Sequence, residues 1–142
     1  MTKSYHGTKK VNATKIIGNP NNIDVDLGSG ELGKGFYTGE SVSIAASWAN
    51  LRFKNEEPCV LEFEKDEKKL LRLKVHHIKT RKEINELHKN LKRTNQRSNH
   101  VFNTDYVIAP FESIDSSLQY KFESKKAETF LNNIKIKVIE CT

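Results

Sequence analysis

The segment Tyr5-His6-Gly7-Thr8 puts side chains suited to binding an amide and a ribose next to one another. A lone histidine is more often structural than functional, so His6 by itself predicts little. Gly7, however, has no side chain where a ligand could approach the backbone closely. Thr8 adds a hydroxyl group that both donates and accepts hydrogen bonds. Together these residues predict a small polar binding site.

In a second segment, two glycines are followed by two aromatic residues. Its sequence is Gly33, Lys34, Gly35, Phe36, Tyr37 and Thr38. One interpretation is a glycine-rich turn that enters a core strand, with both rings packed inside. The other is a binding segment in which Tyr37 stacks on a flat heteroaromatic ring, worth about 1 kcal/mol beyond area burial. The segment lacks the spacing and the Lys-Ser/Thr ending of a P-loop. No predicted helix begins at its glycines, so it is not a Rossmann turn either.

Trp48 lies eleven residues after Tyr37, within a predicted helix. It is either a core tryptophan or the second wall of an aromatic slot whose first wall is Tyr37. The sequence leaves both interpretations open.

In this order, the segments resemble the His-Tyr-Glu branch of the ADP-ribosyltransferase superfamily, which is the branch of diphtheria toxin. The resemblance rests on Tyr5-His6-Gly7-Thr8, on Lys34-Gly35-Phe36-Tyr37, and on Ala45-Ala46 with an aromatic residue at 48. Small bacterial ADP-ribosyltransferase-like domains show the similar pattern HG, then GKGFY-T, then A-x-x-W-A. Towards the other end, Ser116-Ser117-Leu118-Gln119-Tyr120 is similar to Ser-Ser-Val-Glu-Tyr of the toxin branch. Residues 65–104 show no resemblance.

The resemblance implies a split β-sandwich with short helices around a cleft for NAD⁺, the co-substrate, and no metal. His6 would hold the adenosine-side ribose, the backbone of Gly7 would bind the carboxamide, and Thr8 would support that site. Tyr37 would stack on nicotinamide and Trp48 would close the other side. Three further residues of the second segment would also bind the cofactor: Gly35, Phe36 and Thr38. Nicotinamide would leave the anomeric carbon, and an acceptor would attack the oxocarbenium-like ribose.

Gln119 departs from the resemblance, because the third residue of the branch is normally glutamate. A carboxylate stabilises the positive charge that develops on the ribose. An amide accepts a hydrogen bond from a ribose hydroxyl, but it carries no charge and cannot act as a base. Glu112 and Glu123 are candidate substitutes. Glu123 lies roughly 13 Å along the predicted strand, too far without a bend, and both are also explained as surface charges.

Hydrophobic periodicity predicts the elements that position these residues. Strands are expected over residues 4–8, 58–64, 70–75, 106–109, 118–122 and 134–138, and those at 58–64, 118–122 and 134–138 show alternating apolar and polar residues. Helical spacing predicts helices over 9–17, 41–53, 80–92 and 125–132, with Ser41, Thr80 and Ser124 as caps. We expect the strands at 58–64 and 70–75 to pair antiparallel, and residues 18–35 and 93–103 to form loops. In the strand at 118–122, the alternation predicts an apolar face at Leu118, Tyr120 and Phe122, and a polar face opposite. Strands and helices do not strictly alternate, so we expect the α+β class.

Composition limits the function classes. The 142 residues fit one domain, 1–142, that needs no metal or disulfide to hold its core. Two cysteines, no apparent signal peptide and no long apolar run favour a cytoplasmic protein without a membrane partner. The net charge is +6, from 24 Lys and Arg against 18 Asp and Glu, which reflects either a compositional bias or a polyanionic partner.

Basic residues concentrate on the predicted helix at 80–92 and the loop that follows it. The candidates for contact with nucleic acid are Lys82, Lys89, Lys92, Arg93 and Arg97. The alternatives are a solvated helix surface, cations that favour the helix C-terminus, or the contact surface of an antitoxin. Because Gln119 also removes a negative charge, we expect a nucleic-acid acceptor, with RNA ahead of DNA.

Three functions remain open from the sequence. The first is an ADP-ribosyltransferase that acts as an intracellular bacterial toxin, in a toxin-antitoxin pair or in phage defence, on a nucleic acid or on a protein. The second is an NAD⁺ glycohydrolase, which passes the ribosyl cation to water. The third is a binding module for NAD⁺ or nucleic acid that has lost catalysis, and Gln119 keeps this alternative open.

Overall fold

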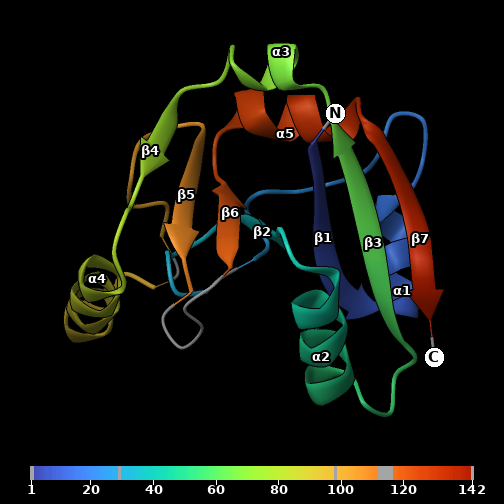
Figure 1. Cartoon of the computed structure of the whole chain (residues 1–142), viewed down its shortest axis with the longest axis horizontal. Helices are drawn as coiled ribbons and strands as arrows, with labels where there is room; N and C mark the ends of the chain where they lie inside the picture. The colour runs from blue at the N-terminus through green and yellow to red at the C-terminus, as the bar shows by residue number, and fades with distance from the viewer. Residues whose placement is uncertain (1, 29, 98, 112–116, 142) are drawn as a thin grey trace. The chain divides into compact units, whose positions relative to one another are not determined.

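The computed structural model describes residues 2–28, 30–97, 99–111 and 117–141 (Figure 1). Across these ranges the chain forms seven β-strands and five α-helices in mixed order. This confirms the predicted α+β class. Within the same ranges, no helix has the length and apolar character needed to cross a membrane.

The chain divides into two compact units that each draw on separate segments. The first unit contains Met1–Ile23, Thr38–Arg72 and Thr129–Thr142, and the second contains Asp24–Tyr37 and Leu73–Glu128. Neither unit is one continuous stretch of chain, so the two are not sequential domains. That the whole chain forms one domain stays a prediction.

An antiparallel set of strands forms the sheet of the first unit, in the order β2 (Phe36–Gly39), β1 (Thr2–Lys9), β3 (Pro58–Lys65) and β7 (Lys135–Cys141). β2 begins in the second unit with Phe36 and Tyr37 and enters the first unit at Thr38. His6 pairs with Leu61 across β1 and β3. Both faces of β3 are largely buried, because α1 (Lys10–Ile16) and α2 (Val42–Arg52) contact β1 and β3. The short helix α3 (Glu67–Leu70) follows β3.

Helix α2 begins as its sequence predicts. The side chain of Ser41 accepts a hydrogen bond from the backbone N–H of Ile44, which satisfies one of the free N–H groups at the helix start. Ala45 and Ala49 are buried on the inner face. Their small size lets the helix backbone come close to β1.

Cys59 and Cys141 form a disulfide between the directly opposed ends of β3 and β7. Two cysteines in the sequence favoured a reducing compartment. The disulfide argues the other way, since such bonds persist mainly in oxidising environments. The pairing was not visible in the sequence, because the two residues are 82 positions apart.

The second unit contains β4 (Val75–His77), β5 (Tyr106–Pro110) and β6 (Leu118–Phe122), in that order. Helix α4 (Arg81–Arg93) contacts β5. Its N-terminus is capped by Thr80, whose hydroxyl accepts a hydrogen bond from the N–H of Glu83. One hydrophobic cluster in the core of this unit contains Leu32, Ile78, Ile84, Val107 and Ala109.

Helix α5 (Lys125–Asn132) runs from the second unit into the first. Ser124 accepts a hydrogen bond from the N–H of Ala127, as expected for a cap. Asn132 and the neighbouring buried Asn21 belong to the first unit. The amide of Asn21 donates to the carbonyl oxygens of Leu131 and Ile134, which fixes the end of the helix.

The predicted strand over residues 70–75 is wrong. Leu70 ends α3, Val75 begins β4, and β4 pairs with β5 in parallel rather than antiparallel with β3. The pattern in this region was short, and a parallel partner 31 residues further along decides its structure. Local alternation cannot indicate such a distant partner.

The predicted faces of β6 are wrong in part, since Phe122 is fully buried as expected but its neighbours depart from the expectation. Gln119 and Lys121, expected on the polar outer face, are 3% and 0% exposed, whereas Leu118 and Tyr120 are only half-buried. Burial of a polar side chain is tolerated when its hydrogen-bonding groups are satisfied. The partners that satisfy these two residues come from a loop and from Glu123, and they are described below.

Candidate functional site

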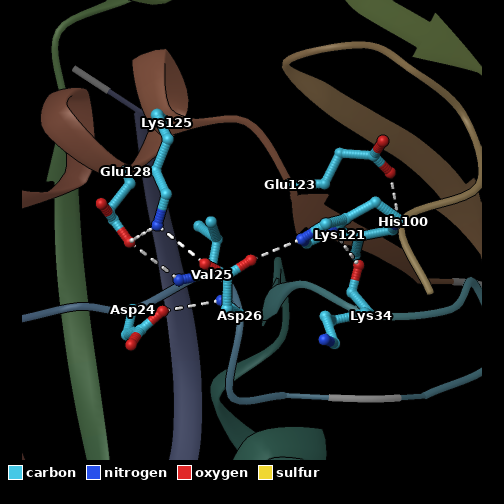
Figure 2. Close-up of polar contacts among 9 residues, drawn as sticks. All are labelled: Asp24, Val25, Asp26, Lys34, His100, Lys121, Glu123, Lys125 and Glu128. Carbon is cyan, nitrogen blue, oxygen red and sulfur yellow. Dashed lines mark hydrogen bonds and ion pairs between the residues drawn. The ribbon is translucent and has the colours of Figure 1, made fainter. Parts of the chain in front are cut away.

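The loop from Asp24 to Gly35 carries the glycine-rich segment in the second unit, and charged residues anchor its first part (Figure 2). Asp26 accepts hydrogen bonds from His100 at 2.7 Å and from Lys125 at 2.8 Å. These two hydrogen bonds, in that order of effect, lower the pKa of Asp26 to about 2. His100 also contacts the carbonyl oxygen of Lys34 through its other ring nitrogen. The loop is thereby held at both ends of the glycine-rich stretch.

Tyr37 is held by the backbone of its own loop. Its hydroxyl accepts a hydrogen bond from the N–H of Leu32 at 3.0 Å and donates one to the carbonyl oxygen of Gly33. The ring is half-buried and packs against the core of the second unit. Burial raises the pKa of Tyr37, and the negative charges of Glu31 and Glu123 act in the same direction against the hydrogen bond from Leu32. Tyr37 therefore remains a neutral phenol.

Two glycines let the loop approach its support closely. A Cβ atom on Gly30 would lie 2.8 Å from Cζ of Tyr37. A Cβ atom on Gly35 would lie 2.3 Å from Cδ of Lys121 and 2.8 Å from the carbonyl oxygen of Phe122. All three distances are too short for any side chain. Gly30 thus lets the loop pack closely against the ring of Tyr37, and Gly35 lets it pack closely against Lys121 and Phe122 of β6.

Gln119 faces this loop. Its amide nitrogen donates to Oε1 of Glu31 at 3.0 Å and to the carbonyl oxygen of Pro110 at 3.2 Å. Glu31 is half-buried. A carboxylate therefore lies at hydrogen-bond distance from Gln119, the position where the sequence predicted a site residue.

Lys121 and Glu123 form a buried ion pair on the same side of β6 as Gln119. The ammonium of Lys121 also lies 4.9 Å from the ring centroid of Phe102. Burial lowers the pKa of Lys121, and the hydrogen bond to Glu123 partly offsets this effect. Glu123, a candidate substitute for the missing glutamate, is thus the partner of a buried lysine. Glu112, the other candidate, lies outside the described residues.

The predicted site residues of the first unit lie on β1, β2 and α2. His6 is half-buried on β1, and Thr8 is buried beside it. A Cβ atom on Gly7 would lie 2.3 Å from the carbonyl oxygen of Ala45. Gly7 is therefore required by the packing of α2, whereas the sequence suggested the approach of a ligand. Its role in binding a carboxamide stays a prediction.

Trp48 does not belong to the core. Its side chain is 53% exposed, while Ala45 and Ala49 of the same helix are buried. Arg52 lies over its ring at 5.8 Å from the centroid. The interpretation of Trp48 as a core tryptophan is therefore wrong, and its role in binding stays a prediction.

Three buried hydroxyl groups near the predicted motifs lack hydrogen-bond partners among the described residues. They are Oγ of Ser4, which precedes Tyr5, Oγ1 of Thr38, which follows Tyr37, and Oγ of Ser117, two residues before Gln119. Phe36, on the other side of Tyr37, is buried. A buried polar group without a partner is costly, and a polar ligand is one way to satisfy it.

The basic residues proposed for nucleic-acid contact are all exposed: Lys82, Lys89, Lys92, Arg93 and Arg97. Helix α4 buries Ile84 and Leu91. Lys82, Lys89 and Arg93 are spaced seven and four residues apart, so they share the opposite face of the helix. This outer face of α4 is the basic surface of the second unit.

A pocket of about 290 Å³ lies beside the anchored loop end. It is lined by His100, Val101, Asn103, Thr104, Glu123 and Ser124. None of the predicted cofactor-binding residues lines it.

Sequence reasoning missed Glu31 and the polar character of the buried face of β6. Glu31 is an acidic residue between glycines of a predicted loop, and such residues are usually solvated. The only local signal was its position two residues before Gly33. Its contact with Gln119 joins residues 88 positions apart.

The part of the chain that the structure describes contains no group of three or more His, Cys, Asp or Glu residues arranged to hold a metal ion. Against known proteins, the chain matches no protein-family model and no curated protein.

Proposed function

We propose that this protein is an NAD⁺-dependent ADP-ribosyltransferase with an ADP-ribosyltransferase-like fold. The observation that carries the proposal is the convergence of Tyr37, Gln119 and Glu31 in one unit. An aromatic ring, an amide and a carboxylate are the groups needed to bind nicotinamide ribose and stabilise positive charge on it. The buried hydroxyl of Thr38 supports the proposal as an unsatisfied group at the same motif.

In the proposed reaction, the bond between the anomeric carbon and the nicotinamide nitrogen breaks. The bonding electron pair stays on nicotinamide, which leaves as a neutral molecule. An acceptor oxygen or nitrogen then bonds to the anomeric carbon and releases one proton. Tyr37 stacks on the departing ring, and the polar groups on β6 and its loop stabilise the ribose cation.

His6, Gly7, Thr8 and Trp48 have roles that come from the resemblance alone. The exposure of Trp48 is compatible with a role in ligand binding. Titration of NAD⁺ into variants such as Trp48→Ala tests each role separately, with loss of affinity as the expected result. An exposed residue of the same unit, Leu51, provides a matched control as Leu51→Ala.

The proposed acceptor is a nucleic acid, with RNA ahead of DNA, and the outer face of α4 is its contact surface. Lys82, Lys89 and Arg93 are exposed on one side of this helix, and cations in a row bind a phosphate backbone with release of counterions. Glu86 is the one acidic residue on the same face. The alternative acceptor is a protein side chain.

Labelled NAD⁺ tests activity and acceptor together. The protein is incubated with labelled NAD⁺ and cell extract, free nicotinamide is measured, and the products are treated with ribonuclease, deoxyribonuclease or protease. Label lost with ribonuclease supports the proposal, and label lost only with protease indicates a protein acceptor. Nicotinamide release without label in any macromolecule indicates a glycohydrolase. Binding of NAD⁺ without release indicates a non-catalytic module.

Charge reversal tests the basic surface. The variant Lys82→Glu/Lys89→Glu/Arg93→Glu should lower the salt dependence of single-stranded RNA binding by a slope of about 2 and leave NAD⁺ affinity unchanged. Lys54→Glu/Lys68→Glu/Lys69→Glu changes the same charge at exposed positions of the first unit and serves as the control. If the two variants lowered the salt dependence of RNA binding equally, the change in net charge would explain the result without a specific contact surface.

We propose that the transferase acts in the cytoplasm as a toxin and that an antitoxin protein neutralises it. NAD⁺ and nucleic acids are both intracellular, whereas the Cys59–Cys141 disulfide favours an oxidising compartment. Expression inside bacterial cells distinguishes the two, since growth arrest that depends on Tyr37 requires an intracellular target.

A further inference from the structure

The amide of Gln119 has one orientation in its buried site. Its nitrogen faces two acceptors, Oε1 of Glu31 and the carbonyl oxygen of Pro110. An amide nitrogen has two N–H donors, and this arrangement uses both. With the nitrogen and oxygen exchanged, the amide oxygen would face two acceptors, so the surroundings determine the orientation.

Glu31 is brought to Gln119 by a loop that is itself fixed. The next residue, Leu32, is buried and donates its N–H to the hydroxyl of Tyr37. A Cβ atom on the preceding residue, Gly30, would lie 2.8 Å from Cζ of Tyr37. Glu31, whose carboxylate accepts from Gln119, therefore lies in the chain between two residues that pack on or bond to the tyrosine that the proposed function places on nicotinamide.

We infer that Glu31 is the catalytic carboxylate of this chain and that Gln119 is a positioning residue that holds it. The inference rests on the proposed NAD⁺-cleaving function. A glutamine at position 119 cannot supply charge or accept a proton, and the carboxylate at 3.0 Å from it can do both. Two residues thus take the place of the glutamate of the resembling enzymes: Glu31 carries the negative charge, and Gln119 holds the Glu31 carboxylate in position.

The carboxylate acts at two moments. While the bond from the anomeric carbon to nicotinamide breaks, it stabilises the cation and accepts a hydrogen bond from a ribose hydroxyl. When the oxygen of the acceptor bonds to the anomeric carbon, Glu31 accepts the proton that this oxygen loses. A carboxylate has about four acceptor sites on its two oxygens, so one hydrogen bond from Gln119 is compatible with these contacts.

The two possible roles of Gln119 predict opposite effects of Gln119→Glu on NAD⁺ turnover. If Gln119 were a degenerate catalytic position, Gln119→Glu would raise NAD⁺ turnover. If Glu31 is the catalytic carboxylate, Gln119→Glu puts two carboxylates about 3 Å apart, and they cannot both stay ionised. The hydrogen bond that aims Glu31 is lost, so turnover falls.

The exchange of the two residues tests whether activity depends on having one carboxylate and one amide at this pair of positions. Nicotinamide release and NAD⁺ affinity are measured for the native protein, Glu31→Gln, Gln119→Glu and the double variant Glu31→Gln/Gln119→Glu. Glu31→Gln should lower kcat by about 100-fold or more, with NAD⁺ affinity changed by no more than about threefold. The double variant again has one amide and one carboxylate and should recover part of the activity that each single variant loses.

Glu40→Gln serves as the control for neutralising an exposed glutamate in the same stretch of sequence and should keep native turnover. Circular dichroism on heating verifies that each variant is folded. A native protein that cleaves NAD⁺ while Glu31→Gln retains its kcat would overturn the role of Glu31 and leave the transferase function standing. Gln119→Glu with raised turnover would do the same. A native protein that neither binds nor cleaves NAD⁺ would instead overturn the proposed function itself.

Discussion

Gly35 rests directly on the aliphatic chain of Lys121, so closely that a Cβ atom at position 35 would lie 2.3 Å from Cδ of the lysine. Lys121 is fully buried and its ammonium is paired with Glu123. The glycine-rich loop is therefore supported by a polar residue of β6 that cannot easily move. This contact links the segment that precedes Tyr37 to the strand that carries Gln119.

Gly35→Ala should destabilise the protein because neither neighbour of the new methyl group can yield. The carbonyl oxygen of Phe122 lies 2.8 Å from the added atom and belongs to a strand. Overpacking of this kind costs about 1–3 kcal/mol, measurable by urea denaturation. Gly39→Ala, at the half-buried end of β2, provides a comparison. Equal stability of Gly35→Ala and the native protein would contradict this packing.

Tyr37→Phe should separate the two contributions of the tyrosine. It keeps the ring for stacking but leaves the N–H of Leu32 and the carbonyl oxygen of Gly33 without the phenol. We expect a loss of about 1–3 kcal/mol in the free energy of unfolding and weaker NAD⁺ binding because the loop loosens. Denaturation and titration calorimetry measure these two effects. Tyr5→Phe, half-buried on β1, is the control.

The buried pair of Lys121 and Glu123 should tolerate joint replacement better than single replacement. Glu123→Gln leaves a buried ammonium without its carboxylate, which costs about 3–5 kcal/mol. Lys121→Met/Glu123→Leu removes both charges and should lie closer to native stability. A double-mutant cycle by chemical denaturation gives the coupling free energy. Additive single effects would show that the pair is not coupled.

Asp26→Asn should change how stability depends on acid. Hydrogen bonds from His100 and Lys125 lower the pKa of Asp26 in the folded protein to about 2, below its ordinary value of 3.8. A lowered pKa contributes stability that is present above the unfolded value and lost as the pH falls through the folded one. The native protein should therefore lose its advantage over Asp26→Asn between about pH 4 and pH 2.

Thermal unfolding across this pH range measures the difference. Asp24→Asn is the control, since Asp24 Oδ1 accepts only from the backbone N–H of Asp26 among the hydrogen bonds described here. Parallel pH curves for the native protein and Asp26→Asn would show that the carboxylate of Asp26 does not contribute in this way.

Reduction of the Cys59–Cys141 disulfide should lower stability because it releases a loop of 82 residues. Chain-entropy arguments give a loss of roughly 4 kcal/mol for a loop of this length. Denaturation with and without reductant measures it, and alkylation with mass spectrometry establishes the bond. Cys59→Ser/Cys141→Ser should then be insensitive to reductant, and an equal response of this variant would point to an effect unrelated to the disulfide.

Local sequence was sufficient for most elements of this chain. The helix caps at Ser41, Thr80 and Ser124 were predicted because each cap depends on residues within three positions. The strands predicted at 58–64 and 106–109 were confirmed, because alternation in the first and a short apolar run in the second are visible among neighbouring residues. Tyr37 and Gln119 were singled out because they lie in short segments that resemble a known family, and their roles in binding NAD⁺ stay predictions.

The environment of those residues depended on contacts across long sequence separations. Which face of β6 is buried was decided by Glu31, Pro110 and Glu123, whose acceptors satisfy Gln119 and Lys121 and so make burial of polar side chains tolerable. The partner of β4 and the pairing of the two cysteines are decided in the same way, by chain segments far from each other. Hydrophobic periodicity reports only on residues that are close together in the sequence. Whether a buried polar group has a hydrogen-bond partner depends on residues that folding brings together. Here the partner of Gln119 is the carboxylate of Glu31, which is 88 positions away in the sequence.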